Sequence, residues 1–107
     1  MTPTVSAPRS LAISAMTGAA PDPVPPSVYR QAVKVLARID ESLALCGSDK
    51  RNVLSATIYL ADVTQKTEFN RAWDEWVDQA NKPARATVEA RLATPDYKVE
   101  IAGIAAR

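Results

Sequence analysis

The chain has 107 residues, of which 47% are hydrophobic and 23% are charged, and its net charge is +1. This length fits one domain, and the composition is that of an ordinary soluble globular protein. The charge balance does not suggest nucleic-acid binding, and no apolar run approaches the ~20 residues that span a membrane. The N-terminus lacks a basic region followed by an apolar segment, so we expect no secretory signal.

The chain contains one cysteine and no histidine. The single cysteine, Cys46, excludes an intrachain disulfide, and we expect a reducing, cytoplasmic compartment. Without histidine, the Ser-His-Asp and Cys-His nucleophile systems and the His-containing zinc sites are excluded, so we expect no metal. Acid–base chemistry would have to use Asp, Glu, Lys, Tyr or a bound water.

The first quarter of the chain predicts one strand and a long loop. Residues 1–10 are polar and interrupted by prolines, so we expect little structure there. Residues 11–16 (LAISAM) alternate as in a short strand. Residues 17–27 contain four prolines and predict a loop, because each proline removes a backbone donor and fixes φ.

A helix is predicted to begin after Ser27, which is a suitable N-cap. The glycine in GSDK (47–50) is a natural residue to end it. Cys46 falls on its apolar face, and we expect it to pack there. The residues that define this face at helical spacing are Ala32, Leu36, Ile39 and Leu43, widened by Val28 and Val35.

Residues 52–63 (NVLSATIYLADV) are apolar and β-rich, and they predict a central strand covered on both faces. A second helix is expected to begin near Thr67, capped by Thr67 or Gln65. Asn70 is mildly unfavourable inside a helix, so we expect its side chain to bond a neighbouring loop. The apolar stripe of this helix, including two tryptophans that we expect to be core, is Phe69, Ala72, Trp73, Trp76, Val77 and Ala80.

Two strands are expected after the second helix. One follows Pro83, the other covers residues 98–106, and TPDY (94–97) has the residues of a turn between them. The order β, α, β, α, β, β predicts an α+β sandwich with two helices packed on one face of a mixed sheet. This arrangement leaves the other sheet face uncovered, and a second copy of the chain could cover it, so we expect a homo-oligomer.

Arg85 and Glu100, in the last two strands, each have two interpretations. A strand could hold Arg85 rigidly and present its planar fork to a carboxylate. Glu100 lies between two apolar residues, where a carboxylate is either at the sheet surface or partly removed from water and available as an acid or base. The second interpretation is that both side chains lie on a solvated strand face, and without further information we favour it for both residues. If the last two strands paired antiparallel, Arg85 would lie far from Glu100.

Three stretches together resemble one known family. PARATVEARL (83–92) followed by YKVEIAGIAA (97–106) resembles the C-terminal signature of the RidA/YjgF family of reactive-intermediate (enamine/imine) deaminases. Residues 47–77 resemble its central strand and second helix. The segments FNRAWDEWV and TPDYKVEI are similar to those of the YoaB-like subgroup. The resemblance runs from about residue 29 to residue 106 within a single domain of residues 1–107, and residues 1–26 form a divergent strand and Pro-rich loop.

The resemblance implies a chorismate-mutase-like fold, assembled as a homotrimer with clefts between subunits and without a cofactor. The carboxylate-binding arginine of the family falls on Arg85, which matches its Pro-x-Arg motif, and its acidic residue falls on Glu100. Its helix asparagine falls on Asn70, the backbone N–H of Thr87 belongs to the same anion site, and its serine is aligned with Ser14. Besides the homotrimer, the implied partner is a small 2-imino or 2-keto acid, with no nucleic acid and no membrane.

The implied reaction is hydrolytic deamination of 2-aminoacrylate-type enamines and imines to 2-keto acids and ammonia, a form of metabolite damage control. Arg85 would anchor the substrate carboxylate, and Glu100 would deprotonate a water for attack on the imine carbon and help ammonia leave.

The chain departs from the family pattern in three places. Ser14-Ala15-Met16 stands where the family has Ser-Gly-Gln, the early aromatic residue has no counterpart in residues 1–16, and Ala102 replaces a common acidic residue. The alternative is therefore a non-catalytic trimeric module of the same fold that binds a small carboxylate or a partner protein. Ribonuclease activity is disfavoured by the absence of histidine and by the near-neutral charge.

Overall fold

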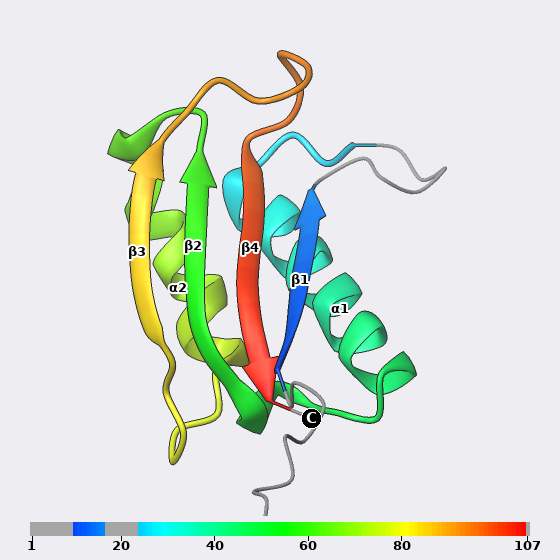
Figure 1. Ribbon diagram of the computed structural model, residues 1–107. Helices are drawn as coiled ribbons and strands as arrows, with labels where there is room; N and C mark the ends of the chain where they lie inside the picture. The colour runs from blue at the N-terminus through cyan, green and yellow to red at the C-terminus, as the bar shows by residue number, and fades with distance from the viewer. Residues whose placement is uncertain (1–9, 17–23, 107) are drawn as a thin grey trace, which may run out of the picture.

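The computed structural model describes residues 10–16 and 24–106, which form one four-stranded sheet with two helices packed against one of its faces (Figure 1). This confirms the predicted two-layer α+β architecture. The segments expected at residues 1–9 and 17–23 lie outside the described residues. The elements are β1 (Ser10–Met16), α1 (Val28–Leu45), η1 (Lys50–Asn52), β2 (Val53–Leu60), η2 (Val63–Gln65), α2 (Lys66–Trp76), β3 (Ala84–Glu89) and β4 (Val99–Ala106), where η marks a 3-10 helix.

The strand order across the sheet is β1-β4-β2-β3. β4 pairs antiparallel with β1 and β2, and β3 pairs parallel with β2 at the edge. Because α2 carries the chain back along the sheet between β2 and β3, these two strands run in the same direction. The idea of an antiparallel pair made by the last two strands was wrong, since β2 lies between β3 and β4.

α1 begins and ends as the sequence predicts. Ser27 is its N-cap, and the Ser27 Oγ accepts the N–H of Arg30 at 3.1 Å. Gly47 has a φ of +73°, which glycine adopts without the steric cost of a side chain, and its N–H bonds the Ala44 carbonyl. Cys46, the C-cap, is exposed, so the prediction that it packs in the core was wrong.

α2 is shorter than predicted and ends at Trp76. The helix stops where Val77 adopts an extended conformation, with φ −63° and ψ 141°. Side chains satisfy the groups near this end: Lys50 Nζ donates to the Trp76 carbonyl at 2.8 Å, and Asp78 Oδ1 accepts the Ala80 N–H at 3.0 Å. Ala80 is consequently exposed rather than part of the buried stripe. Gln65 occupies the N-cap position but makes no side-chain capping bond.

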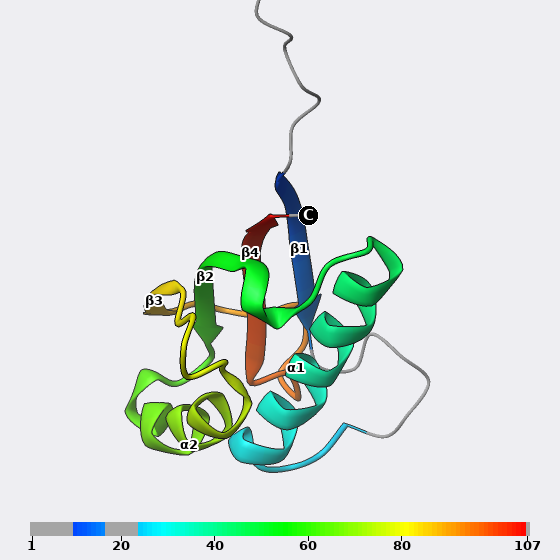
Figure 2. The same ribbon diagram turned by 90° about the horizontal axis from the view of Figure 1, so that it is seen from below.

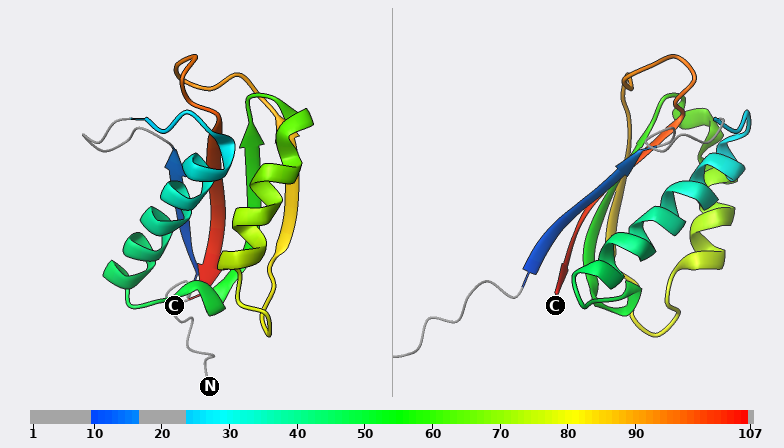
Figure 3. Two further views of the ribbon diagram at one scale, coloured as in Figure 1. Left: turned by 180° about the vertical axis from the view of Figure 1, so that it is seen from behind. Right: turned by 90° about the vertical axis from the view of Figure 1, so that its right-hand side faces the viewer.

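The core lies between the sheet and the two helices, which cover the same face (Figures 2 and 3). Along β2, alternate residues Ala56, Ile58 and Leu60 are buried beneath the helices, whereas Thr57 and Tyr59 are half-buried on the opposite face. The central strand is therefore covered on one face by the chain itself, not on both as predicted. Among the described residues, no helix is long and apolar enough to cross a membrane.

Candidate functional site

Arg85 lies on the helix-covered face of β3, at the sheet edge. Its register partner on β2 is the buried Ala56, which places it on the side of α2. Arg85 Nη2 donates to Asn70 Oδ1 of α2 at 2.7 Å, so Asn70 bonds a strand residue rather than the loop that we expected. The guanidinium carbon lies 5.6 Å from the Phe69 ring centroid and 5.3 Å from that of Trp73. These contacts hold a positive charge in a fixed place.

The Arg85 guanidinium is only partly removed from water. Partial burial against α2 lowers its pKa, and the nearby Asp74 acts in the opposite direction. Arginine stays protonated even when it is partly buried, so Arg85 carries its full charge. One edge of the planar fork is held by a neutral amide, and the residue as a whole is exposed. The remaining donors can therefore pair with an anion.

Thr87 adds two polar groups two residues along the same strand. The Ala90 N–H donates to the Leu60 carbonyl of β2 at 2.9 Å. Because backbone N–H groups alternate between the two sides of a strand, the N–H of Thr87 faces the sheet edge that no described strand covers. The Thr87 Oγ1 is buried and makes no hydrogen bond within the described part of the chain. Arg85, Asn70 and Thr87 thus form one cluster, which we call the arginine cluster.

Glu100 lies on the other face of the sheet. Its neighbours Val99 and Ile101 are buried under the helices, so the half-buried Glu100 points to the face that the helices leave open. Its register partners are Met16 on β1 and Tyr59 on β2.

Ser14 lies on β1 beside this position. Its backbone pairs with Ala102, two residues beyond Glu100 on β4, so Ser14 occupies the same strand side as Glu100 at the backbone level. Its side chain lies outside the described structure. The predicted site residues whose side chains are described therefore fall into two groups: the arginine cluster on the helix-covered face and Glu100 on the open face. Within one chain the sheet separates the two groups.

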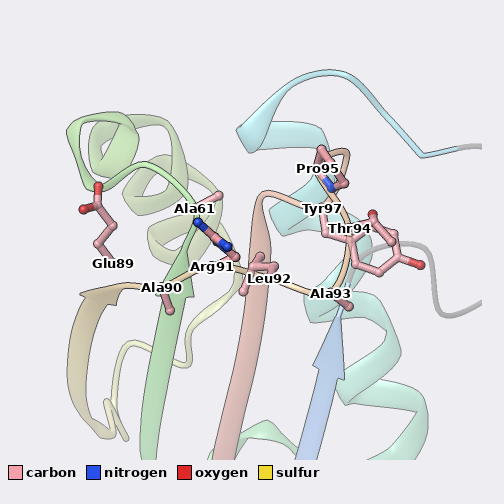
Figure 4. A pocket seen from close by; sticks show the side chains of 9 residues that line it. All are labelled: Ala61, Glu89, Ala90, Arg91, Leu92, Ala93, Thr94, Pro95 and Tyr97. Carbon is pink, nitrogen blue, oxygen red and sulfur yellow. The ribbon is translucent and has the colours of Figure 1, made fainter.

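One hollow on the described part of the chain contains none of the predicted site residues. It has a volume of about 650 Å³ and lies beneath the loop that joins β3 to β4, around the ends of β2 and β4 (Figure 4). Sequence reasoning missed this hollow, because the loop residues carry no periodic pattern. It also missed the aromatic support of Arg85, although the Phe69 and Trp73 spacing placed both rings on one side of α2. The residues that line the hollow are Ala61, Glu89, Ala90, Arg91, Leu92, Ala93, Thr94, Pro95 and Tyr97.

Within residues 10–16 and 24–106, no group of three or more Cys, Asp or Glu side chains is arranged to hold a metal ion. The described polar groups of the two clusters are one guanidinium, one amide, one hydroxyl and one carboxylate. This set can bind an organic anion and move a proton.

Residues 3–107 match the family described as Endoribonuclease L-PSP. A RutC family protein of Haemophilus influenzae is 53% identical over 79 residues, which are 74% of this chain and 68% of the relative. The RutC family protein YoaB of Escherichia coli is 43% identical over 86 residues, 80% of this chain and 75% of the relative. A 2-iminobutanoate/2-iminopropanoate deaminase of Capra hircus is 33% identical over 100 residues, 91% of this chain and 72% of the relative.

Solved structures agree with the fold. NMB1025, a YjgF-family protein of Neisseria meningitidis, superposes with a TM-score of 0.82 at 43% identity, covering 89% of this chain and 76% of that one. Yeast Mmf1 superposes with a TM-score of 0.84 at 25% identity, covering 95% of this chain and 82% of that one. The arrangement of two helices on a mixed sheet is therefore shared with proteins of this group.

Proposed function

The chain belongs to the Endoribonuclease L-PSP family, which is the RidA/YjgF family, and we propose that it hydrolyses reactive 2-imino acids to 2-keto acids and ammonia. The observation that carries the proposal is the arginine cluster, in which Asn70 and two aromatic rings hold the exposed Arg85. A relative from Capra hircus, 33% identical, is named for this chemistry.

Arg85 binds the substrate carboxylate in this proposal. A planar guanidinium pairs with both oxygens of a carboxylate, and the edge-facing N–H of Thr87 offers a third donor two residues along the strand. The hydrogen bond that Arg85 donates to Asn70 limits the rotation of the Arg85 side chain. Arg85 therefore fixes the position of the imine carbon without taking part in bond making.

Glu100 moves the protons. A 2-aminoacrylate molecule first isomerises to its imine, 2-iminopropanoate. Glu100 takes a proton from a water, whose oxygen forms a bond to the imine carbon and gives a carbinolamine. Glu100 returns this proton to the nitrogen. The hydroxyl proton of the carbinolamine then passes through Glu100 to the nitrogen as the carbon–nitrogen bond breaks and the carbonyl forms, so that the nitrogen leaves as ammonia. The products are pyruvate and ammonia, and Glu100 is restored.

The proposal requires two copies of the chain. Glu100 and the arginine cluster lie on opposite faces of one sheet, so one chain cannot bring both to the same substrate. In an assembly in which the open face of one copy meets the β3 edge of the next, Glu100 of one copy and Arg85 of its neighbour can share a cleft. A face-to-edge contact is heterologous and forms a ring when its rotation closes, and the ring in this proposal is a trimer with three such clefts.

The second candidate function is binding without turnover. Arg85, Asn70 and Thr87 suffice to hold a carboxylate, whereas the chain departs from the family pattern around Ser14 and Ala102. A module of this kind would bind 2-oxobutanoate but would not accelerate imine hydrolysis.

The deciding experiment measures 2-keto acid and ammonia release from freshly generated 2-aminoacrylate. Wild type should accelerate hydrolysis, and Arg85→Ala should lower the rate roughly 10- to 100-fold, the loss expected for one charge-assisted carboxylate contact. Arg51→Ala is the matched control, because the exposed Arg51 bonds Asp49, two residues away, and its removal deletes the same charge. Arg51→Ala should keep the wild-type rate.

Three outcomes separate the candidates. Equal rates for wild type and Arg85→Ala would remove the proposed anchor. No acceleration by wild type, together with calorimetric binding of 2-oxobutanoate that Arg85→Ala abolishes, would favour the binding module. No acceleration and no binding would contradict both functions.

A further inference from the structure

Gln31 is a fully buried polar side chain in the first turns of α1. Its exposed fraction is 0%, and it is the one polar or charged residue among the buried residues of the described chain. It lies on the apolar face of α1, between Val28 and Ala32. Burying an amide costs free energy unless all of its hydrogen-bonding groups find partners, so such a residue needs a specific reason to be there.

Every hydrogen-bonding group of the Gln31 amide has a backbone partner. Its Nε2 donates to the Pro25 carbonyl at 2.6 Å and to the Asp96 carbonyl at 3.0 Å, and its Oε1 accepts the Lys98 N–H at 2.8 Å. Two carbonyls and one N–H require two donors and one acceptor, which an amide supplies. A carboxylate would place an oxygen against two carbonyls, and an apolar side chain would leave all three groups unpaired.

These bonds join segments that are far apart in the sequence. Pro25 precedes α1, whereas Asp96 and Lys98 belong to the loop between β3 and β4. Lys98 is held on both sides, because its N–H bonds Gln31 and its carbonyl accepts the Ala61 N–H at 3.1 Å. The chain is therefore fixed between α1 and the end of β2 just before β4 begins.

Glu100 is the second residue of β4, two positions after Lys98. Its backbone pairs with Tyr59, so its place on the open face follows from where β4 starts against β2. A shift at Lys98 moves the first residues of β4 together, because the strand is nearly inextensible.

The same bonds hold the loop over the large hollow. Thr94, Pro95 and Tyr97 line the hollow and surround Asp96, whose carbonyl Gln31 binds (Figure 4). The Thr94–Tyr97 turn closes with its own hydrogen bond of 3.1 Å, so it moves as a unit. Ala61, which bonds Lys98, lies at the strand end of the hollow. One side chain thus fixes both the start of β4 and the turn above the hollow.

We propose that Gln31 is a positioning residue for the reaction: it fixes the loop between β3 and β4, and through Lys98 it places the Glu100 carboxylate. This inference rests on the proposed function, in which Glu100 moves the protons. The side-chain hydrogen bonds of Gln31 go to Pro25, Asp96 and Lys98 and not to the arginine cluster, so carboxylate binding should not depend on it.

The test compares Gln31→Met with Val35→Ala. Methionine keeps the volume of glutamine and removes its polar groups. Val35 is fully buried one turn further along α1, so its truncation destabilises the core without touching the loop. Gln31→Met should lower kcat for imine hydrolysis roughly 10- to 100-fold, the effect of displacing a reacting group by about 1 Å. The dissociation constant of 2-oxobutanoate should change less than about threefold, because the ligand contacts are unchanged.

The comparison overturns the proposal in two ways. If Val35→Ala lowers kcat as much as Gln31→Met at an equal loss of melting temperature, Gln31 contributes only stability. If Gln31→Met weakens 2-oxobutanoate binding as much as it lowers kcat, the residue supports the arginine cluster instead.

Amide hydrogen exchange tests the role of Gln31 without an activity assay. The exchange rate of a core amide in the same sample shows whether the variant is folded. In wild type, the Lys98 amide should exchange as slowly as the core amide of Ile58, although Lys98 stands at the end of a loop. In Gln31→Met it should exchange at least about tenfold faster, with the Ile58 amide of β2 much less affected. Fast exchange of Lys98 in wild type would overturn the proposal. Should wild type show no deaminase activity, the proposed function fails, and the exchange rates alone decide whether Gln31 holds the start of β4.

Discussion

Replacing Asn70 with aspartate tests how the arginine cluster binds an anion. Asn70 Oδ1 accepts a hydrogen bond from Arg85 Nη2 at 2.7 Å, and it does so without neutralising the charge. An aspartate at this position keeps the size and the accepting oxygen but adds a negative charge. Asn70→Asp would therefore form an internal ion pair with Arg85 and would repel the carboxylate of a ligand on the other edge of the guanidinium.

The size of the effect follows from the distance between the two carboxylates. Groups on opposite edges of one guanidinium are about 6 Å apart, and Coulomb's law gives about 0.7 kcal/mol at the dielectric constant of water and about 2.8 kcal/mol at an effective value of 20. These energies correspond to roughly 3-fold and 100-fold weaker binding. Because Arg85 is exposed, water screens the repulsion, and we expect a loss of about tenfold.

The assay is titration calorimetry of 2-oxobutanoate against wild type, Asn70→Asp and Asn70→Ala at low ionic strength. Asn70→Ala removes the acceptor without adding charge, so it should weaken binding less than Asn70→Asp. The difference between Asn70→Asp and wild type should shrink in ~1 M salt, where the screening length falls to about 3 Å. Binding to Asn70→Asp as tight as to wild type, or weaker binding to Asn70→Ala than to Asn70→Asp, would refute this description of the cluster.

Two further predictions concern the fold. A Cβ at Gly103 would lie 2.8 Å from the Ser55 backbone oxygen of β2, so Gly103→Ala should lower the free energy of unfolding in urea by about 1 to 3 kcal/mol, and an unchanged value would contradict the packing. Hydrogen bonds from the Arg51 side chain and from its backbone N–H lower the pKa of Asp49 to about 2, so an NMR titration should place its midpoint there. Arg51→Ala removes the side-chain bonds and should raise the pKa toward ~3.9. Because the folded-state pKa of Asp49 is depressed, any stability from this pair is present above about pH 3.9 and is lost as the pH falls through about 2. A titration midpoint near ~3.9 in wild type would rule out the pairing.

Local patterns in the sequence predicted the elements but not how the strands pair. Ser27 and Gly47 mark the ends of α1 because capping is a local property of the chain. The place of β3 beside β2 depends on contacts between distant residues, and an alternating strand pattern is compatible with either neighbour. At the end of α2, Lys50, far away in the sequence, bonds the last carbonyl, a contact that no local pattern predicts.

The candidate residues could be chosen from the sequence, but their faces could not. Arg85 and Asn70 contact each other because the register of β3 against β2 places Arg85 under α2. This register cannot be predicted from the sequence of β3 or of α2. The opposite placement of Glu100 follows from the alternation of β4 once its buried residues are known. Gln31 carried a signal that went unused, since a glutamine among the apolar residues of a helix face indicates a buried hydrogen-bonding role.

The central claim is that the site is built from two copies of the chain. It is tested most directly by mixing Arg85→Ala subunits with Glu100→Gln subunits under conditions where subunits exchange. Each variant alone should keep at most about a tenth of the wild-type activity. In a random equal mixture, sites that combine Arg85 of one copy with Glu100 of its neighbour should restore about a quarter of the wild-type deaminase activity. An assembled mixture that stays as inactive as its two parents would contradict the claim.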